Sequence, residues 1–292
     1  MLRLGQGIHQ GVPIESYVAD PAPDPSVNSG MLWALLNQSP QHAKAQHPRL
    51  NPEHEQDASA RLDIGSIAHA LLLEEDSSKV VVIEADDWRK KDTKEQRDAA
   101  RAEGKLPILS KDYFGIQAMV TAARFQIAKS EFATDFKEAI PEQTLIWQHE
   151  GVWCRSRPDK ATKDWRILFD YKTAASAHPG AFQRAMVQNG YDLQAELGMM
   201  GAEALTGTTR LTFVFLVQEL DPPYAMSFIS MSPAWQELAH QKVLRGLSTW
   251  KGCIRTNDWP SYTPQVAYVE PPGYASMGWD DYLLPIDAED IV

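Results

Sequence analysis

The first half of the chain alternates apolar helical patterns with polar loops. An apolar run over residues 29–38 begins at Ser29 and stops before Pro40, which predicts a helix with Ser29 as its N-cap. Apolar residues recur at helical spacing over residues 64–73, so the segment GSIAHALLLE predicts a second helix. The polar, proline-broken stretch HPRLNPEHEQDA between them predicts a loop.

A strand, a charged segment and a long helix follow. KVVVIEA has the compact apolar pattern of a strand, and residues 110–130 have the amphipathic pattern of a helix capped by Ser110. Between them lies a segment rich in basic residues: Arg89, Lys90, Lys91, Lys94, Arg97, Arg101 and Lys105. Two interpretations of this segment stay open, a solvated helix face and an arm that contacts phosphate groups.

From Thr144 onward the pattern changes to short strands. TLIWQHEGVWCRSRPD predicts a hairpin that turns at residues 149–151, and WRILFDYKTA predicts a third strand. One or two helices follow over residues 178–205, then the strands TRLTFVFLVQEL and YAMSFISMS, a helix from Pro233 to Arg255 and a proline-rich tail. Strands grouped in the second half with helices around them predict an α/β (α+β) fold, in which helices flank a central mixed β-sheet on both faces.

Composition and charge narrow the class of protein only a little. The 292 residues are 43% hydrophobic and 23% charged, an ordinary globular balance with enough length for one large domain or two small ones. Two cysteines supply neither a disulfide framework nor a cysteine-rich metal cluster. The net charge of −11 argues against a protein that coats nucleic acid without specificity, yet it leaves room for a local basic groove.

The chain lacks the patterns of a membrane protein or a secreted protein. No apolar run approaches the roughly 18 residues that span a bilayer, and the first residues lack the apolar core of a signal peptide. We therefore expect a cytoplasmic protein that has no membrane partner.

The predicted strand ILFDYK is apolar at its start and carries two charged residues, Asp170 and Lys172, near its end. Residues two apart on a strand share a face, so Asp170 and Lys172 point one way while Phe169 and Tyr171 point the other. An acid and a lysine with one residue between them occur elsewhere in the chain, but only this pair closes an apolar strand. Charges beside a core are costly unless they bind something or pair with each other.

A second acid, Asp159, ends the preceding strand-like run. Adjacent antiparallel strands would bring its carboxylate near Asp170, where the two acids repel each other unless a cation lies between them. Mg²⁺ binds through few carboxylates and keeps positions for phosphate oxygens, and Lys172 beside it would stabilise charge in phosphodiester hydrolysis. The alternative is an ordinary Asp–Lys salt bridge at the end of a strand.

The order of these motifs resembles a known nuclease superfamily. A Pro-Asp pair followed by a strand ending in D-x-K is similar to the PD-(D/E)XK superfamily, and more narrowly to the exodeoxyribonuclease VIII (RecE-like) group, which is related to lambda-type exonuclease. The resemblance runs roughly from Ser29 to Trp259, through NSGMLWALLNQSP, GSIAHALLLE, EQTLIW, CRSRPDK, ILFDYKTA, YDLQAEL, FVFLVQELDPPY and DWPSY. It implies a restriction-endonuclease-like fold with an N-terminal extension (1–28), a nuclease domain (29–262) and a C-terminal tail (263–292).

Carried over position by position, the resemblance implies roles for single residues. Asp159 and Asp170 would bind metal, and Tyr171 would offer its backbone carbonyl to the same ion. Lys172 would be the catalytic lysine. His69 matches a helix-borne histidine near the metal or the scissile phosphate, although a lone histidine in such an apolar helix is more often part of a packed core.

The resemblance is weaker at the outer positions of the site. Glu142 matches an acid that would ligate a second metal, but its setting also suits a solvated loop acid. Gln194 stands where the family has the glutamine of Q-x-x-x-Y; Tyr191 matches a tyrosine often seen there, and Gly198 replaces the motif's own tyrosine. This departure puts the grip on the DNA backbone in doubt and leaves the metal and lysine group intact. The basic run from Arg89 to Lys105 also falls where family members are rich in Lys and Arg, and the resemblance implies that Arg89, Lys90 and Lys91 bind the DNA substrate.

The leading hypothesis is a Mg²⁺-dependent exodeoxyribonuclease, with Mn²⁺ as an alternative ion. The resemblance implies digestion of linear double-stranded DNA from its ends, in the 5′-to-3′ direction, leaving 3′ overhangs for recombination. It also implies a ring-shaped homo-oligomer and a strand-annealing recombinase as partner. Two other hypotheses stay open, an endonuclease of the same fold and a non-catalytic DNA-end-binding protein. The presence of Asp159, Asp170 and Lys172 counts against the non-catalytic protein.

Overall fold

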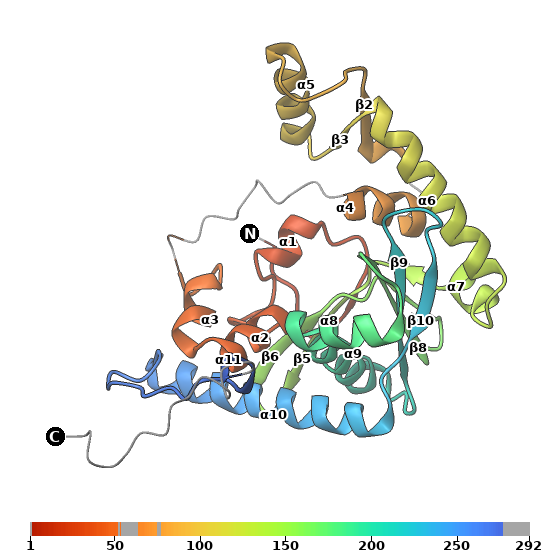
Figure 1. The fold of residues 1–292 in the computed structure, drawn as a ribbon. Coiled ribbons are helices and arrows are strands. Elements are labelled where there is room, and N and C mark those ends of the chain that lie inside the picture. The colour runs from red at the N-terminus through yellow and green to blue at the C-terminus, as the bar shows by residue number, and fades with distance from the viewer. Residues whose placement is uncertain (1, 52, 54–63, 75–76, 277–292) are drawn as a thin grey trace. The chain divides into compact units, whose positions relative to one another are not determined.

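The computed structural model describes residues 2–51, 53, 64–74 and 77–276. The chain divides into two compact units, Met1–Pro260 and Ser261–Val292. The second unit is described over residues 261–276, where the short helix α11 (Gly273–Ser276) follows residues without regular structure. All strands of the described chain belong to the first unit (Figure 1).

A five-stranded mixed sheet forms the centre of the first unit. Its neighbouring strands are, in order, β10 (Met226–Ile229), β9 (Thr212–Glu219), β8 (Ile167–Ala174), β7 (Lys160–Ala161) and β4 (Ile140–Pro141). β8 and β9 run parallel, and the other neighbouring pairs run antiparallel. The predicted central mixed sheet is therefore confirmed.

A second, antiparallel sheet contains the predicted hairpin. Its strands are β1 (Gly7–His9), β5 (Thr144–His149) and β6 (Val152–Ser156). The chain reverses at Glu150 and Gly151, which have positive φ angles of 47° and 82°. Gly151 adopts this backbone region without steric cost. The turn falls within residues 149–151, as the sequence predicts.

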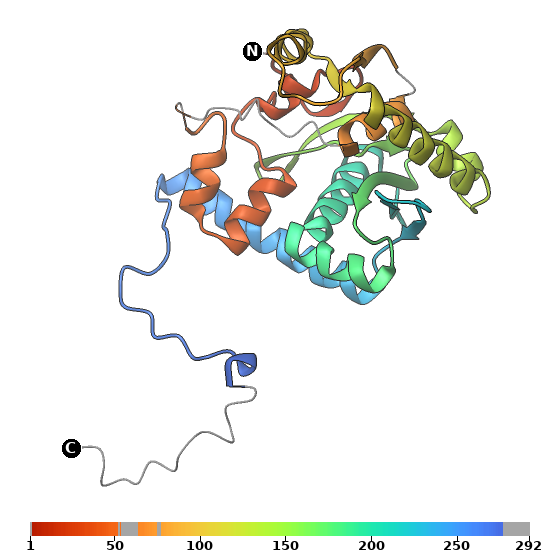
Figure 2. The same ribbon diagram turned by 45° about the horizontal axis from the view of Figure 1, so that its top comes forward.

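Helices cover both faces of the five-stranded sheet (Figure 1, Figure 2). One core faces Leu168 and Phe215 and includes side chains from α2 (Ser29–Asn37), α3 (Pro40–Gln46), α8 (Pro179–Asn189), α9 (Tyr191–Thr206) and α10 (Pro233–Thr256). The other core faces Phe169 and Leu216 and includes side chains from α4 (Ile64–His69), the π-helical turn η1 (Ala70–Glu74), α6 (Ser110–Ala128) and α7 (Ala133–Glu138). Successive residues of one strand thus enter opposite cores, as strand geometry requires.

A small parallel unit separates η1 from α6 in the sequence. After the 3₁₀ turn η2 (Ser77–Lys79) come β2 (Val80–Ile83), α5 (Lys91–Ala102) and β3 (Leu106–Leu109), and the two strands pair in parallel. A helix is the usual crossover between parallel strands. The pattern predicts β2, and a helix at α5 is one of the two interpretations left open for the charged segment. It does not predict β3, because four residues that include Pro107 form too weak a strand signal.

Both predicted helix caps are wrong by one residue. Asn28 rather than Ser29 caps α2, and its side chain accepts a hydrogen bond from the Met31 N–H at 2.9 Å. The extended backbone of Asn28 allows this contact, which is typical of an N-cap. Leu109 holds the cap position of α6 because β3 runs directly into the helix, and Ser110 is already the first helical residue.

Gly190 divides the predicted helical region 178–205 into α8 and α9. Its φ is 67°, and a Cβ atom at this position would lie only 2.5 Å from Cδ1 of Trp33. Because glycine has no Cβ atom, it can adopt the left-handed backbone and also leaves room for the close approach of Trp33 on α2. The break sets the start of α9, and with it the positions of Tyr191 and Gln194.

Residues before Ser29 belong to the first compact unit. β1 pairs with β5, the short helix α1 (Ile14–Val18) follows, and Val27 pairs with Cys154. The division after residue 28 that the resemblance implies therefore does not coincide with a boundary of this unit. Within the described residues, no helix combines the length and the apolar character that crossing a membrane requires.

Candidate active site

Two antiparallel neighbours in the sheet bring the two aspartates together. β7 pairs with β8 in a register that sets Lys160 opposite Phe169. Asp159, one residue before Lys160, therefore lies beside Asp170 and Tyr171. The Tyr171 N–H donates a hydrogen bond to Asp159 Oδ2 at 2.7 Å, which fixes the orientation of this carboxylate.

Asp159 lies outside the strand that the sequence predicts it to end. β6 stops at Ser156, and Asp159 stands just before β7. Pro158 separates them, and a proline has no N–H with which to extend a ladder of hydrogen bonds. The expected closeness to Asp170 holds all the same, because β7 is the antiparallel neighbour of β8.

Asp170 and Lys172 lie on the same face of β8 and pair with each other. Lys172 Nζ is 2.7 Å from Asp170 Oδ2, and the Asp170 side chain is 1% exposed. The side-chain amide of Gln194 donates to the other oxygen, Oδ1, at 2.6 Å. Lys172 faces Oδ2 and Gln194 faces Oδ1, so each oxygen of this buried carboxylate lies against a positively charged or N–H partner.

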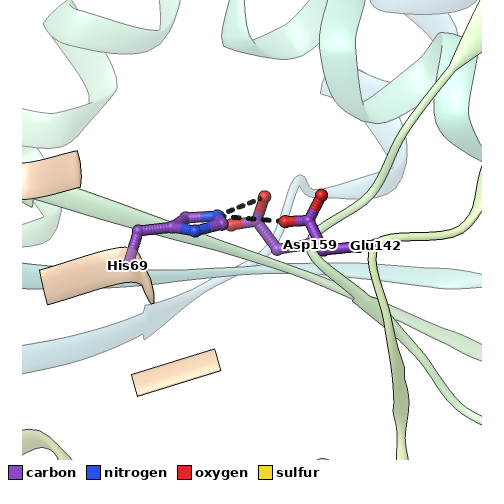
Figure 3. Close-up of side chains that lie close together, drawn as sticks. All are labelled: His69, Glu142 and Asp159. Atoms are coloured by element: carbon purple, nitrogen blue, oxygen red, sulfur yellow. Dashed lines mark ion pairs between the residues drawn. The ribbon is translucent and has the colours of Figure 1, made fainter. Parts of the chain in front are cut away.

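His69 reaches the same place from α4. Gly65 permits this helix to approach β8, because a Cβ atom there would lie 2.8 Å from Thr173 Oγ1. His69 Nε2 is 3.0 Å from Asp159 Oδ1 and 3.6 Å from Glu142 Oε1 (Figure 3). The histidine therefore contacts charged groups rather than a packed apolar core.

Glu142 reaches the site from a turn with left-handed backbone. Its φ is 57°, and its N–H donates to the backbone oxygen of Asp159 at 2.9 Å. Arg157 Nε donates to Glu142 Oε2, and Arg157 Nη1 donates to the backbone oxygen of Val12 at 2.7 Å. Glu142 is thus held by backbone and side-chain contacts, unlike a solvated loop acid.

His69, Glu142, Asp159, Asp170 and Lys172 are called the active-site cluster below. One ligand atom from each of His69, Glu142 and Asp159 lies within 4.8 Å of the others. Two carboxylate oxygens suit a hard divalent cation such as Mg²⁺ or Mn²⁺. An imidazole nitrogen is more typical of transition-metal sites, so this set of three favours Mn²⁺ over Mg²⁺. Asp170 stands outside this group of three and borders it through Asp159. The donor set of His69, Glu142 and Asp159 fits a divalent cation.

Tyr171 contacts the site in the structure through its N–H. The N–H and C=O of one strand residue point to the same side, so its carbonyl faces the same edge as the contact with Asp159. The Tyr171 side chain points into the core that includes Phe169 and Leu216, where its hydroxyl donates a hydrogen bond to Gln218 at 2.6 Å. A metal contact for the Tyr171 carbonyl stays a prediction.

The charged groups of the active-site cluster shift one another's pKa values. Burial disfavours a charged His69, but the carboxylates of Asp159 and Glu142 outweigh it and raise the pKa of His69 to about 9. Burial, offset only in part by Lys172, raises the pKa of Asp170 to about 6. Against burial, the carboxylates of Asp170 and Asp159 raise the pKa of Lys172 above its ordinary value. A cation that takes the His69 imidazole as ligand must therefore displace a proton.

The start of α9 places two predicted residues against the Asp170–Lys172 pair. Besides Gln194, the ring of Tyr191 lies 4.9 Å from Lys172 Nζ, the distance of a cation–π contact. One turn beyond Gln194, Gly198 packs into the core, where a Cβ atom would lie 3.3 Å from Phe213 Cε2. A tyrosine at position 198 would have to displace that ring, so the departure from Q-x-x-x-Y matches the local packing.

The structure does not bring Arg89, Lys90 and Lys91 to the active-site cluster. They lie where the chain enters α5, and the Arg89 and Lys91 side chains are 91% and 87% exposed. Arg89 pairs with Asp87 and Lys91 with Glu95. No contact in the described part of the chain joins them to the cluster, so a solvated helix face describes them in the isolated chain.

Arg157 and Tyr17 are not among the residues that the sequence predicts for this site. Arg157 directly precedes Pro158-Asp159, and a basic residue beside a metal-binding motif was the available signal. The ring of Tyr17 lies 5.9 Å from the guanidinium carbon of Arg157 and 5.6 Å from that of Arg155. Nothing in the sequence around Tyr17 indicates this contact, because it joins segments far apart in the chain.

Three features define a PD-(D/E)XK-like protein: the mixed sheet, an aspartate just before β7 beside an aspartate on β8, and a lysine two residues after the second aspartate. The chain belongs to the family described as "PDDEXK-like domain of unknown function (DUF3799)", whose model matches residues 30–272. No curated protein matches the sequence.

The fold is similar to that of a crystal structure described as a "Putative exonuclease" from Eubacterium rectale. The identity is 12% and the TM-score 0.60, over 92% of this chain and 98% of that one. A second solved structure, described as "SSO0001", covers 69% of this chain and 98% of its own at 14% identity, and its TM-score of 0.26 carries no argument. Family and fold confirm the predicted superfamily and support nuclease activity; they do not single out the exodeoxyribonuclease VIII group.

Proposed function

We propose that this protein is a divalent-metal-dependent deoxyribonuclease that digests linear double-stranded DNA from its ends. The observation that carries the proposal is the active-site cluster, in which the ligand atoms of His69, Glu142 and Asp159 gather beside the buried Asp170–Lys172 pair. An ordinary salt bridge at a strand end would not need three further ionisable groups around it. Acids of this kind beside a lysine suit phosphodiester hydrolysis.

The residues of the cluster divide the chemistry among them. Asp159, Glu142 and His69 would hold the divalent cation, with Asp170 as a further acid, and the ion supplies positive charge for phosphodiester oxygens. Lys172, which stays protonated at neutral pH, presents a second positive charge where negative charge develops on the reacting phosphate. The ion pair with Asp170 and the ring of Tyr191 orient its ammonium group.

The resemblance to the exodeoxyribonuclease VIII group supports finer proposals. These are 5′-to-3′ polarity, 3′ overhangs for recombination, Mg²⁺ as the working ion, a ring-shaped homo-oligomer and a strand-annealing recombinase as partner. The exposed basic residues Arg89, Lys90 and Lys91 support a role for α5 as an arm that contacts DNA phosphates. Gln194 and Tyr191 are proposed to act near the substrate through Asp170 and Lys172.

A nuclease assay with end-labelled DNA tests the proposal. Linear duplex labelled at the 5′ or the 3′ end is incubated with Mg²⁺, Mn²⁺ or EDTA beside covalently closed circles. We expect early loss of the 5′ label, intact circles and no reaction in EDTA. Cleavage of circles would instead indicate an endonuclease, and the absence of cleavage with any divalent metal would indicate a DNA-end-binding protein.

Two substitutions connect the activity to the cluster. Lys172→Ala and Asp170→Ala are expected to retain the fold and to lower cleavage by at least about 100-fold, the scale of losing one electrostatic contact in a transition state. Circular dichroism checks the fold. Lys163→Ala is the matched control, because this exposed lysine pairs with Glu138 at the surface. Wild-type rates in both cluster variants would refute the site.

A further inference from the structure

We propose that Arg157 is a positioning residue that fixes Glu142 in the active-site cluster, and that the N-terminal segment, residues 2–28, holds Arg157 in place. The proposal rests on the proposed function, because it assumes that Glu142 is a metal ligand. The matching family model begins at residue 30, so this segment lies outside the part of the chain that the family defines.

The guanidinium of Arg157 joins three parts of the chain. Nε donates to Glu142 Oε2, and Nη1 donates to the backbone oxygen of Val12 at 2.7 Å. The guanidinium carbon also lies 5.9 Å from the centre of the Tyr17 ring, within cation–π distance. The Arg157 side chain is 12% exposed, so it is largely buried where it contacts Glu142 of the active-site cluster.

Within the described residues, Arg157 donates the side-chain hydrogen bond that Glu142 accepts, and His69 is its other charged neighbour. Glu142 is 20% exposed and follows Pro141 on a backbone with a φ of 57°. Arg157 engages Oε2, and the remaining oxygen Oε1 faces His69 Nε2 at 3.6 Å. Without the guanidinium, the carboxylate would gain rotamers that point into water, and each rotamer lost on binding a cation lowers the affinity.

The N-terminal segment is tied firmly enough to hold Arg157. Val12 is buried, and β1 pairs with β5. Behind Tyr17 lies Arg155, whose Nη1 donates to the backbone oxygen of Ser26 at 2.7 Å and pairs with the buried Asp20 at 3.4 Å. These contacts connect the segment to β6 and place the Val12 carbonyl and the Tyr17 ring beside Arg157.

Titration of Mn²⁺ into the full-length protein, without DNA, tests the proposal. Free Mn²⁺ is measured by electron paramagnetic resonance for the wild type, Arg157→Gln, Arg157→Lys and Tyr17→Leu. We expect Arg157→Gln to bind Mn²⁺ about 10- to 100-fold more weakly, the usual effect of losing a partner of a metal ligand. Arg157→Lys is expected to recover part of the loss, and Tyr17→Leu to weaken binding by a smaller factor.

A matched control removes a similar ion pair elsewhere. Arg166 Nε lies 2.5 Å from Asp164 Oδ2 on the surface, where the arginine side chain is 72% exposed. Arg166→Gln is expected to bind Mn²⁺ as the wild type does. Thermal unfolding without metal is recorded for each variant, because a purely structural role for Arg157 would lower the melting temperature and leave the Mn²⁺ affinity of the folded protein unchanged.

The outcomes separate this proposal from the proposed function. Wild-type Mn²⁺ affinity in folded Arg157→Gln, Arg157→Lys and Tyr17→Leu would overturn it, even if the wild type cleaves DNA. A wild type that binds no Mn²⁺ would overturn it as well. A wild type that binds Mn²⁺ through Arg157 and cleaves no DNA would refute the nuclease and leave the positioning role standing. In an active enzyme, Arg157→Gln is expected to raise the KM for metal and to spare kcat at saturating metal.

Discussion

The side-chain amide of Gln194 donates to Asp170 Oδ1 at 2.6 Å while Lys172 Nζ lies 2.7 Å from the opposite oxygen. Gln194 lies on α9, whereas Lys172 lies on β8, the strand that also carries Asp170. The carboxylate is 1% exposed, so these side chains replace the water that would otherwise surround it. In the isolated chain, Gln194 therefore orients an acid of the active-site cluster.

Removal of the Gln194 side-chain amide is expected to lower both the stability of the protein and its rate of DNA cleavage. Gln194→Ala leaves Asp170 Oδ1 without its donor in a buried position, which lowers the free energy of unfolding by about 1–3 kcal/mol. DNA cleavage should fall as well, because the acid loses its fixed orientation. Gln241→Ala is the control, since its amide donates to Glu237 on an exposed helix face and its loss costs within about 0.5 kcal/mol. Urea unfolding measures both, and equal losses would contradict the assignment.

A divalent cation that binds only the folded chain should stabilise it. At a Mn²⁺ concentration 100-fold above Kd, the gain is about 2.7 kcal/mol. Thermal unfolding in Mn²⁺ and in EDTA measures it as a rise in Tm. Asp159→Asn and His69→Ala should lose most of this rise, because both supply ligand atoms to the group of three. Asp98→Asn, at an exposed pair with Arg97, should keep it. A full rise in both site variants would place the cation elsewhere.

Gly65 should be required for the approach of α4 to β8. Gly65→Ala places a methyl group 2.8 Å from Thr173 Oγ1, and we expect a loss of about 1–3 kcal/mol from overpacking together with lower activity as His69 moves. The second substitution Thr173→Ala should restore part of both. Gly115→Ala in α6 is the control: apart from its chain neighbours and the backbone of its own helix, no atom of the described residues lies within 4 Å of the new methyl group, so helix propensity should stabilise it by up to about 1 kcal/mol. Equal effects of the two alanines would refute the packing argument.

Asp20 should make stability depend on pH in the acid range. Burial opposes ionisation, but His47, Arg155 and Ser26 outweigh it and lower the pKa of Asp20 to about 2. A group with a lowered folded pKa contributes stability that is present above its unfolded pKa and is lost as pH falls through the folded value. The shift from 3.8 corresponds to about 2 kcal/mol, lost between about pH 4 and pH 2.

Urea unfolding across that pH range measures the contribution of Asp20. Asp20→Asn should lower stability at pH 7 by about 3–5 kcal/mol, because it leaves the buried Arg155 without its counter-charge. Its stability should also vary less between pH 4 and pH 2 than that of the wild type. The same pH profile in both proteins would show that Asp20 is not the group responsible.

Local patterns in the sequence determined the central strand and the chemistry on it. Strand residues alternate between faces, so Asp170 and Lys172 had to share one side and Phe169 and Tyr171 the other, whatever surrounds the sheet. The order of the motifs indicated the superfamily, which family and fold confirm. Antiparallel pairing was expected to bring Asp159 beside Asp170, and it does. The sequence placed Asp159 at the end of the strand now seen as β6, whereas it stands just before β7.

Only the tertiary structure decided how these groups are held. The contacts of Gln194 with Asp170, of Arg157 with Glu142 and Val12, and of Gly65 with Thr173 join elements far apart in the chain. Each depends on how closely a helix or a turn packs against the sheet, to within a few tenths of an ångström. A periodic pattern records which face of an element is apolar, and it carries no information about which distant side chain meets that face. The partners of the active-site cluster therefore became visible only once the elements were packed together.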